Sequence, residues 1–147
     1  MAAPLDADEL ALWHAFKRAG EGVRAAIGAE IARSTGLSDP DFGILTRLDD
    51  ADGSLRQQDL ATSMGWHRSR LSHQLTRMEH RGLVVRVTRD PAVQVALTDA
   101  GRAAAAAARP VHARAVRRHL LDHIPRDRRA ELLSLLESLN TDRPGER

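Results

Sequence analysis

Cysteine is absent from this 147-residue sequence. Disulfide bonds, thiol-based redox sensing and zinc sites built from thiolates are therefore excluded. No run of 18 or more apolar residues occurs, so no segment is expected to span a membrane. The acidic N-terminus, MAAPLDADEL, also lacks the basic and apolar regions of a signal peptide. These absences predict a cytoplasmic protein with no membrane partner.

The motifs that carry catalysis are missing as well. There is no glycine-rich phosphate loop and no nucleophile elbow, and no paired ligand motif accompanies the acidic residues considered next. Asp49, Asp50 and Asp52 cluster in a turn-rich segment and raise the alternative of acid–base or metal chemistry, but a solvated turn explains them better. The sequence therefore predicts a protein that is not an enzyme, with no catalytic residues and no cofactor.

The net charge is small, but the charged residues are unevenly distributed. The whole chain carries +2. Residues 1–55 hold five basic and ten acidic side chains, a net charge of −5. Residues 56–90 hold seven basic and three acidic side chains, a net charge of +4. This concentration of positive charge is typical of a segment that meets nucleic acid phosphates.

The stretch Leu55–Leu83 predicts two short helices joined by a turn at Gly65. Ala61 and Gly65 are small enough for the two helices to cross closely. In the second helix, an apolar stripe with helical spacing predicts one buried side; it consists of Leu71, Leu75 and Met78. The opposite face carries Ser69, Arg70, His73, Thr76 and Arg77. Short polar and cationic side chains suit the major groove of DNA, so we interpret this stretch as a helix-turn-helix.

Two β-branched runs follow, Val84–Val87 and Val93–Leu97, and they predict a β-hairpin. Arg86 lies on its first strand and Arg89 near its tip. A helix-turn-helix followed by a hairpin is the arrangement of a winged helix-turn-helix. The expected fold class is thus mainly α with a small β-hairpin wing (α+β), and the DNA-binding region spans residues 38–99.

Residues 1–36 and 100–147 are predicted to form amphipathic helices outside this unit, with a frayed tail at 141–147. A winged helix-turn-helix needs only about 70–80 residues for its core, so these helices have surplus apolar surface. We expect them to form a homodimer interface, with a monomeric helical bundle as the alternative. The predicted interface residues are Leu10, Trp13, Phe16, Leu120, Leu121, Leu132, Leu135, Leu136 and Leu139.

Short motifs along the chain lie in an order shared with a known family. They are Leu60-Ala61, Met64-Gly65, Arg68-Ser69-Arg70-Leu71-Ser72, Gly82-Leu83-Val84 and Leu97-Thr98 with Gly101-Arg102. With these motifs the sequence resembles the MarR (multiple antibiotic resistance regulator) family over nearly its whole length, as a single domain spanning 1–147. At the wing tip, where family members commonly carry Asp-Arg-Arg, this chain has Arg89-Asp90-Pro91-Ala92.

The resemblance implies a homodimeric transcriptional regulator, usually a repressor, that binds a pseudo-palindromic operator in double-stranded DNA. It also implies release by a small, often aromatic or anionic, effector that binds between the dimer and DNA-binding regions. Candidate effector-pocket residues are Trp13, His14 and Phe16.

We expect the helix formed by residues 67–81 to enter the major groove. Its predicted contacts to base edges come from Arg70, His73 and Arg77. Predicted contacts to bases or phosphates come from Ser69, Ser72 and Gln74. Arg68 lies nearer the buried side and is expected to bind a phosphate or to have a structural role. The wing contributes Arg86 and Arg89, with Arg89 as the candidate for the minor groove.

Two alternatives remain open from the sequence. One is a helical protein-interaction module that does not bind DNA. The other is a zinc-responsive regulator, because His119 and His123 have the i, i+4 spacing of metal ligands and His112 lies seven residues before His119. Solvated histidines on an arginine-rich helix are commoner, so no metal site is predicted.

Overall fold

The computed structural model describes residues 1–141, so most of the tail expected to fray lies outside the described residues. The elements are α1 (Ala7–Thr35), α2 (Asp39–Asp50), β1 (Ser54–Arg56), α3 (Gln57–Met64), α4 (Arg68–His80), β2 (Val84–Arg89), β3 (Ala92–Leu97), α5 (Asp99–His119), the 3-10 turns η1 (Leu121–His123) and η2 (Arg126–Arg128), and α6 (Arg129–Thr141). The predicted fold class, helices with a small antiparallel wing, is confirmed. Across residues 1–141, no helix has the length and apolar character needed to cross a membrane.

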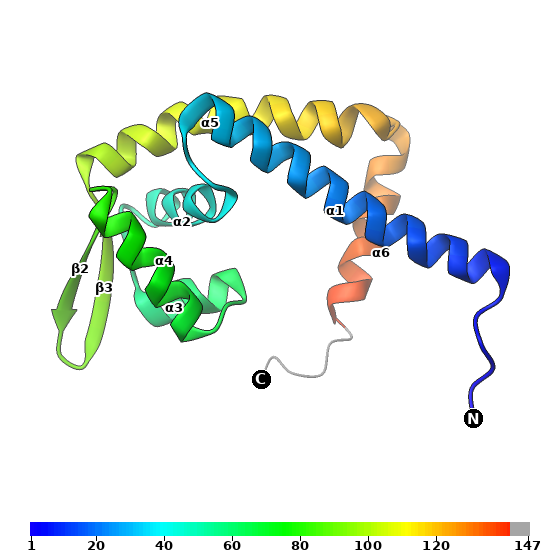
Figure 1. Cartoon of the computed structure of the whole chain (residues 1–147), viewed down its shortest axis with the longest axis horizontal. Coiled ribbons are helices and arrows are strands. Elements are labelled where there is room, and N and C mark those ends of the chain that lie inside the picture. Colours follow the sequence, from blue (N-terminus) through cyan, green and yellow to red (C-terminus); the bar gives the residue numbers. More distant parts are fainter. Residues whose placement is uncertain (142–147) are drawn as a thin grey trace.

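Helices α1 and α5 pack against each other along the length of the molecule (Figure 1). In this view a lobe made of α2, α3, α4 and the sheet lies below one end of α5, and α6 lies below the other end. The hydrophobic core lies in the lobe and under the adjoining part of α5, where Ala105 and Ala108 are fully buried. From α1, Ile31 is the one residue that the core buries completely. The rest of α1 extends away from the lobe.

The ends of the first two helices follow from their sequences. Asp6 begins α1 with a capping box that includes Glu9, and Gly36 ends it in the left-handed conformation at φ +74°. Ser38 begins α2 with a second capping box, in which Asp41 accepts the Ser38 backbone N–H. The helix predicted within residues 1–36 is confirmed as α1, and the chain turns sharply between α1 and α2.

The sheet contains one more strand than the sequence predicted. The predicted hairpin is confirmed as β2 and β3, but β1 pairs with the other edge of β3, with Leu55 opposite Val95. At three residues, β1 is too short to give a periodic signal, and its partner lies about 40 residues along the chain. The pairing of β1 with β3 fixes the start of α3 against the wing.

The wing returns to the core at a tight contact between Leu83 and the first turn of α5. Thr98 caps α5 by accepting the Gly101 N–H at 3.0 Å, and its hydroxyl donates to the Gly82 carbonyl at 2.5 Å. A Cβ atom at Gly101 would overlap the Leu83 carbonyl oxygen. The Leu-Thr-x-x-Gly motif therefore has a steric origin, because only glycine fits against this backbone.

Candidate nucleic-acid interface

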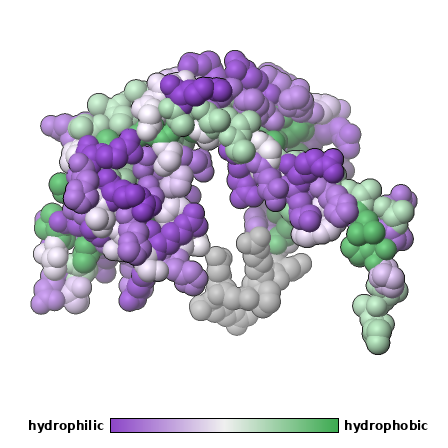
Figure 2. Space-filling model, in the orientation of Figure 1, coloured by the Kyte–Doolittle hydropathy of each residue, from purple (hydrophilic) through white to green (hydrophobic). Residues whose placement is uncertain are grey.

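Helix α4 separates a buried and an exposed face as its sequence predicts. Leu71, Leu75 and Met78 are fully buried in the core. The exposed side chains include Arg68, Ser69, Arg70, His73, Thr76 and Arg77. Figure 2 shows mainly hydrophilic residues over the front of the lobe that carries α3 and α4. The helix begins at His67 without a side-chain cap, which leaves its first backbone N–H groups free for an anion.

The only acidic residue in α4, Glu79, is paired with an arginine from the wing. Arg86 Nε donates to Glu79 Oε1 at 2.6 Å, and the same guanidinium donates to Thr76 Oγ1 at 2.8 Å and to Ser72 Oγ at 3.3 Å. The structure thus places Arg86 and Ser72 in a link between β2 and α4, whereas the sequence suggested that both face DNA. Because the pairing offsets the Glu79 charge, the outer face of α4 keeps a positive character.

Arg70 is held by an aromatic ring that the sequence analysis missed. Its guanidinium carbon lies 3.8 Å from the centroid of the Trp66 ring, a cation–π contact. Trp66 lies in the turn between α3 and α4 and packs against the core on its other side. A tryptophan just before the start of the helix is the signal that would have identified this contact. The stacking limits the directions in which Arg70 can point.

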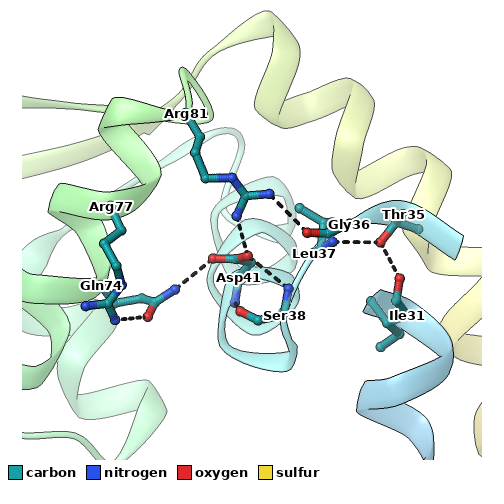
Figure 3. Close-up of polar contacts among 9 residues, drawn as sticks. All are labelled: Ile31, Thr35, Gly36, Leu37, Ser38, Asp41, Gln74, Arg77 and Arg81. Atoms are coloured by element: carbon teal, nitrogen blue, oxygen red, sulfur yellow. Dashed lines mark hydrogen bonds and ion pairs between the residues drawn. The ribbon is translucent and has the colours of Figure 1, made fainter. Parts of the chain in front are cut away.

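The structure corrects the prediction for Gln74. Its side chain faces inward and only 7% of the residue is exposed, so it is not placed to contact DNA. Gln74 lies three residues after Leu71 and four before Met78, which puts it on the buried stripe of α4. Its Nε2 donates to Asp41 Oδ1 at 2.7 Å, and its Oε1 accepts from Arg77 Nη2 at 2.5 Å (Figure 3).

Asp41 also joins α4 to the corner between α1 and α2. Arg81, at the end of α4, donates from Nη1 to Asp41 Oδ2 at 2.7 Å and from Nη2 to the Gly36 carbonyl at 3.1 Å (Figure 3). The Asp41 side chain is 5% exposed and that of Arg81 is 45% exposed. A buried carboxylate is costly unless it is paired and hydrogen-bonded, and Asp41 is both. The position of α4 relative to α2 is thereby fixed at its C-terminal end.

A groove of about 470 Å³ separates α3 and the start of α4 from the wing. Arg56 and Arg68 line it, together with the wing residues Pro91 and Val93. This position supports the predicted phosphate contact of Arg68 and adds Arg56, which the sequence analysis missed, to the cations near it. Arg89 is exposed at the end of β2, beside the two-residue tip of the wing.

The residues predicted to form the dimer interface lie on α1, on α6 and at the α5–η1 junction. Leu10, Trp13 and Phe16 are 40%, 48% and 51% exposed, although they are large and apolar. The other exposed members of the predicted set are Leu135, Leu136 and Leu139, whereas Leu120, Leu121 and Leu132 are half-buried. Leu12 and Leu133 are also exposed and were not predicted. Patches of this kind mark interaction surfaces.

The candidate effector residues lie on the exposed part of α1. Trp13 and Phe16 stack on each other with their ring centroids 6.4 Å apart, and Lys17 lies over the Trp13 ring at 5.1 Å. His14 lines a shallow hollow with Lys17, Arg18 and Glu21.

Two of the three histidines considered for zinc have other partners. The His112 ring stacks on Phe42 at 4.5 Å, and His119 Nε2 lies 2.8 Å from Glu30 Oε1. This hydrogen bond lowers the pKa of the Glu30 carboxyl from its ordinary value of 4.5; burial acts in the opposite direction, and Arg118 reinforces the lowering. Within residues 1–141 no group of three or more His, Cys, Asp or Glu side chains could hold a metal ion.

The acidic cluster considered for catalysis is tied to α5. Asp49 Oδ2 accepts from Arg109 Nη2 at 3.2 Å, and Asp50 Oδ1 accepts from the same atom at 2.7 Å. Arg102 also donates to Asp49, at 3.4 Å. These contacts connect the end of α2 with α5 and give the Asp49 and Asp50 carboxylates a structural role.

Comparison with known proteins agrees with this geometry. A sequence family described as a domain of unknown function (DUF7343) matches residues 36–89, and no curated protein sequence matches the chain. AbsC, a MarR family transcriptional regulator from Streptomyces coelicolor, has 28% identity and a TM-score of 0.90, with 95% of this chain and 97% of AbsC covered. The transcriptional repressor CouR, solved with p-coumaroyl-CoA, has 34% identity and a TM-score of 0.78, with 95% of this chain and all of CouR covered.

The chain belongs to the MarR family of transcriptional regulators. The resemblance inferred from the sequence motifs is therefore confirmed. A second MarR family regulator from Streptomyces coelicolor, Sco3205, was solved in complex with DNA. It has 25% identity and a TM-score of 0.91, with 99% of this chain and 95% of Sco3205 covered. The MarR similarity thus includes α1, α5 and α6 as well as the winged lobe.

Proposed function

We propose that this MarR-family chain is a sequence-specific DNA-binding repressor that binds a pseudo-palindromic operator as a homodimer. Residues 38–99 bind DNA, and residues 1–36 and 100–147 form the dimer. The observation that carries the proposal is the outer face of α4, where Arg70 and Arg77 are exposed and held in place while the single acid of the helix is paired with Arg86. The DNA complex of Sco3205 and the repressor description of CouR support it.

In this proposal α4 enters the major groove and Arg70 and Arg77 contact base edges. Arginine binds guanine through two parallel hydrogen bonds, and each such contact gives about 1–3 kcal/mol of discrimination. The groove between α3, α4 and the wing receives the DNA backbone, with Arg56 and Arg68 at the phosphates. Arg89, at the wing tip, enters the minor groove. Two copies of α4 then meet successive major grooves about 34 Å apart.

The exposed apolar residues of α1 and α6 support the homodimer, because a MarR monomer would leave them in water. The CouR complex with p-coumaroyl-CoA supports an aromatic or anionic effector. We propose that such a molecule binds near Trp13 and Phe16 once a second chain completes the walls, and that its binding releases the operator. The regulator requires no resident cofactor and catalyses no reaction in this scheme.

Selection from a random duplex library tests DNA binding directly. The full-length protein should enrich a two-fold symmetric sequence with half-sites one helical turn apart. Arg70→Ala should weaken binding of the selected duplex by about 1–3 kcal/mol and relax the preference at one base position. Arg126→Ala removes the same charge from an exposed position far from the lobe and should leave binding unchanged.

Salt dependence provides the second test. The logarithm of the association constant should fall linearly with the logarithm of the salt concentration, with a slope of about −0.9 for each phosphate contacted. Failure to enrich any sequence, together with no duplex binding at low salt, would show that the chain is a protein-interaction module. A panel of p-coumaroyl-CoA, aromatic carboxylates and free coenzyme A, added to the preformed complex, then tests release by an effector.

A further inference from the structure

Arg77 is held by a series of hydrogen bonds that ends in a buried carboxylate. Arg77 donates to the Gln74 amide oxygen, and the Gln74 amide nitrogen donates to Asp41 Oδ1 (Figure 3). Asp41 is 3% exposed, so the inner bond is shielded from water. The series connects an exposed cation on α4 with the first turn of α2, 33 residues before Gln74.

The direction of these bonds is set by Asp41. An ionised carboxylate only accepts hydrogen bonds, so the amide nitrogen of Gln74 must face it. The amide oxygen of Gln74 then faces outward, where it accepts from Arg77. If the amide were turned by half a rotation, its nitrogen would oppose the guanidinium, and two donors cannot bond to each other.

Asp41 is fixed by its own partners. Its second oxygen, Oδ2, accepts the Ser38 backbone N–H at 2.9 Å and Arg81 Nη1 at 2.7 Å. The positive charge of Arg81 offsets the negative charge of the Asp41 carboxylate. The capping box of α2 holds the Asp41 side chain in one orientation. In residues 1–141 no buried side-chain nitrogen or oxygen lacks a partner, so this network is fully bonded.

We propose that Asp41 is a positioning residue for DNA recognition, which acts through Gln74 to set the direction of the Arg77 guanidinium. This inference rests on the proposed function, because it takes Arg77 as a DNA contact. Asp41 itself stays buried in α2 and does not touch DNA. Holding a long, flexible cation in its binding direction reduces the conformational entropy that is lost on association.

The polarity of the network suggests two substitutions that break it singly and restore it together. Asp41→Asn keeps one oxygen for Ser38 and Arg81 and turns a nitrogen toward Gln74, so two donors oppose each other. Gln74→Glu places two carboxylates within hydrogen-bond distance. In the double variant the new amide nitrogen at position 41 donates to one oxygen of the new carboxylate at position 74. The other oxygen of that carboxylate accepts from Arg77, and the pair keeps its original net charge.

The experiment measures dissociation constants by fluorescence anisotropy on the duplex selected by the wild-type protein. Each single variant should weaken binding about tenfold, the effect expected for a charge-assisted hydrogen bond. The double variant should return to within about threefold of wild type. In an Arg77→Ala background neither single substitution should weaken binding further, whereas in an Arg70→Ala background both should.

Two controls separate positioning from folding. Asp39→Asn removes the same charge from the same first turn of α2 at an exposed position, and it should leave the dissociation constant unchanged. Gln74→Met keeps the volume of the side chain and the bonds of Asp41 to Ser38 and Arg81, and it should reproduce the loss of affinity. Thermal melting confirms that each variant is folded at the assay temperature.

The outcomes distinguish this inference from the proposed function. Equal losses for Asp41→Asn with and without Arg77, or a double variant no better than the single ones, would show that Asp41 acts only through stability. Unchanged binding by Arg77→Ala would also overturn the inference, while DNA binding itself would stand. If the wild-type protein binds no duplex, the proposed function fails instead.

Discussion

The close contact between α5 and the wing leads to a stability prediction of defined sign. Gly101 lies in the first turn of α5, where a methyl group would overlap the Leu83 carbonyl oxygen and lie 3.0 Å from the Leu83 carbonyl carbon. The Leu97 side chain would be 3.2 Å away. The oxygen cannot move freely, because it accepts the Thr98 N–H at 3.2 Å. Gly101→Ala should therefore destabilise the protein.

The size of the effect is the difference between two opposing contributions. Alanine is favoured over glycine inside a helix by about 1 kcal/mol. Overpacking costs about 1–3 kcal/mol, and the upper end applies here because the clash is with backbone. We expect a net loss of about 2 kcal/mol, which corresponds to a fall in Tm of about 6 °C for a chain of this size.

A second glycine provides the matched control. At Gly28 in α1 the nearest atom to an added methyl is Asp39 Cβ at 3.7 Å, an ordinary contact. Gly28→Ala should raise stability by up to about 1 kcal/mol through helix propensity alone. Urea unfolding of both variants, at one protein concentration, measures the two effects. A Gly101→Ala protein as stable as wild type would refute the steric explanation of the motif.

Three further predictions concern the site, the α1–α5 contact and the interface. Trp66→Leu should weaken operator binding about two- to fivefold through loss of the cation–π contact, whereas Trp66→Phe should retain most of the affinity. In an Arg70→Ala background neither substitution at Trp66 should change the affinity. Glu30→Gln should lower the free energy of unfolding near pH 7. Because the pKa of Glu30 is depressed in the folded state, the difference from wild type should shrink as the pH falls below 4.5. A difference that stays constant with pH in denaturant titrations would contradict the pairing of Glu30 with His119 and Arg118. Phe16→Glu should shift the sedimentation equilibrium toward monomer, and an unchanged mass would place the interface elsewhere.

The features that the sequence predicted correctly are local ones. The buried stripe of α4 and the hairpin depend on residues within a few positions of each other, so helical and strand periodicity reveal them. The same periodicity puts Gln74 on the buried stripe, but it was predicted to contact DNA because a polar residue was taken to face water. Its partner, Asp41, lies 33 residues away, and no local pattern can indicate that a buried acceptor lies there.

The same limit explains Arg86 and β1. Arg86 was correctly placed on a strand. Whether its side chain faces DNA or Glu79 depends on how the wing lies against α4, which the sequence does not show. β1 is defined only by its pairing with β3. Among the exposed residues, Arg70 and Arg77 could be named from the sequence, whereas the contacts that orient them come from the tertiary structure.

Helix α5 contacts α1 on one side and the winged lobe on the other, and the ion pairs of Arg102 and Arg109 connect it to the end of α2. Its 21 residues make it about 31 Å long. Over that length, a tilt of about 10° moves one end by about 5 Å relative to the other, more than the roughly 3.4 Å rise of one base pair. In the homodimer that we propose, a tilt of this size at the far end of α5 would change the distance between the two α4 helices by more than one base-pair step, and so would change how well they match one operator.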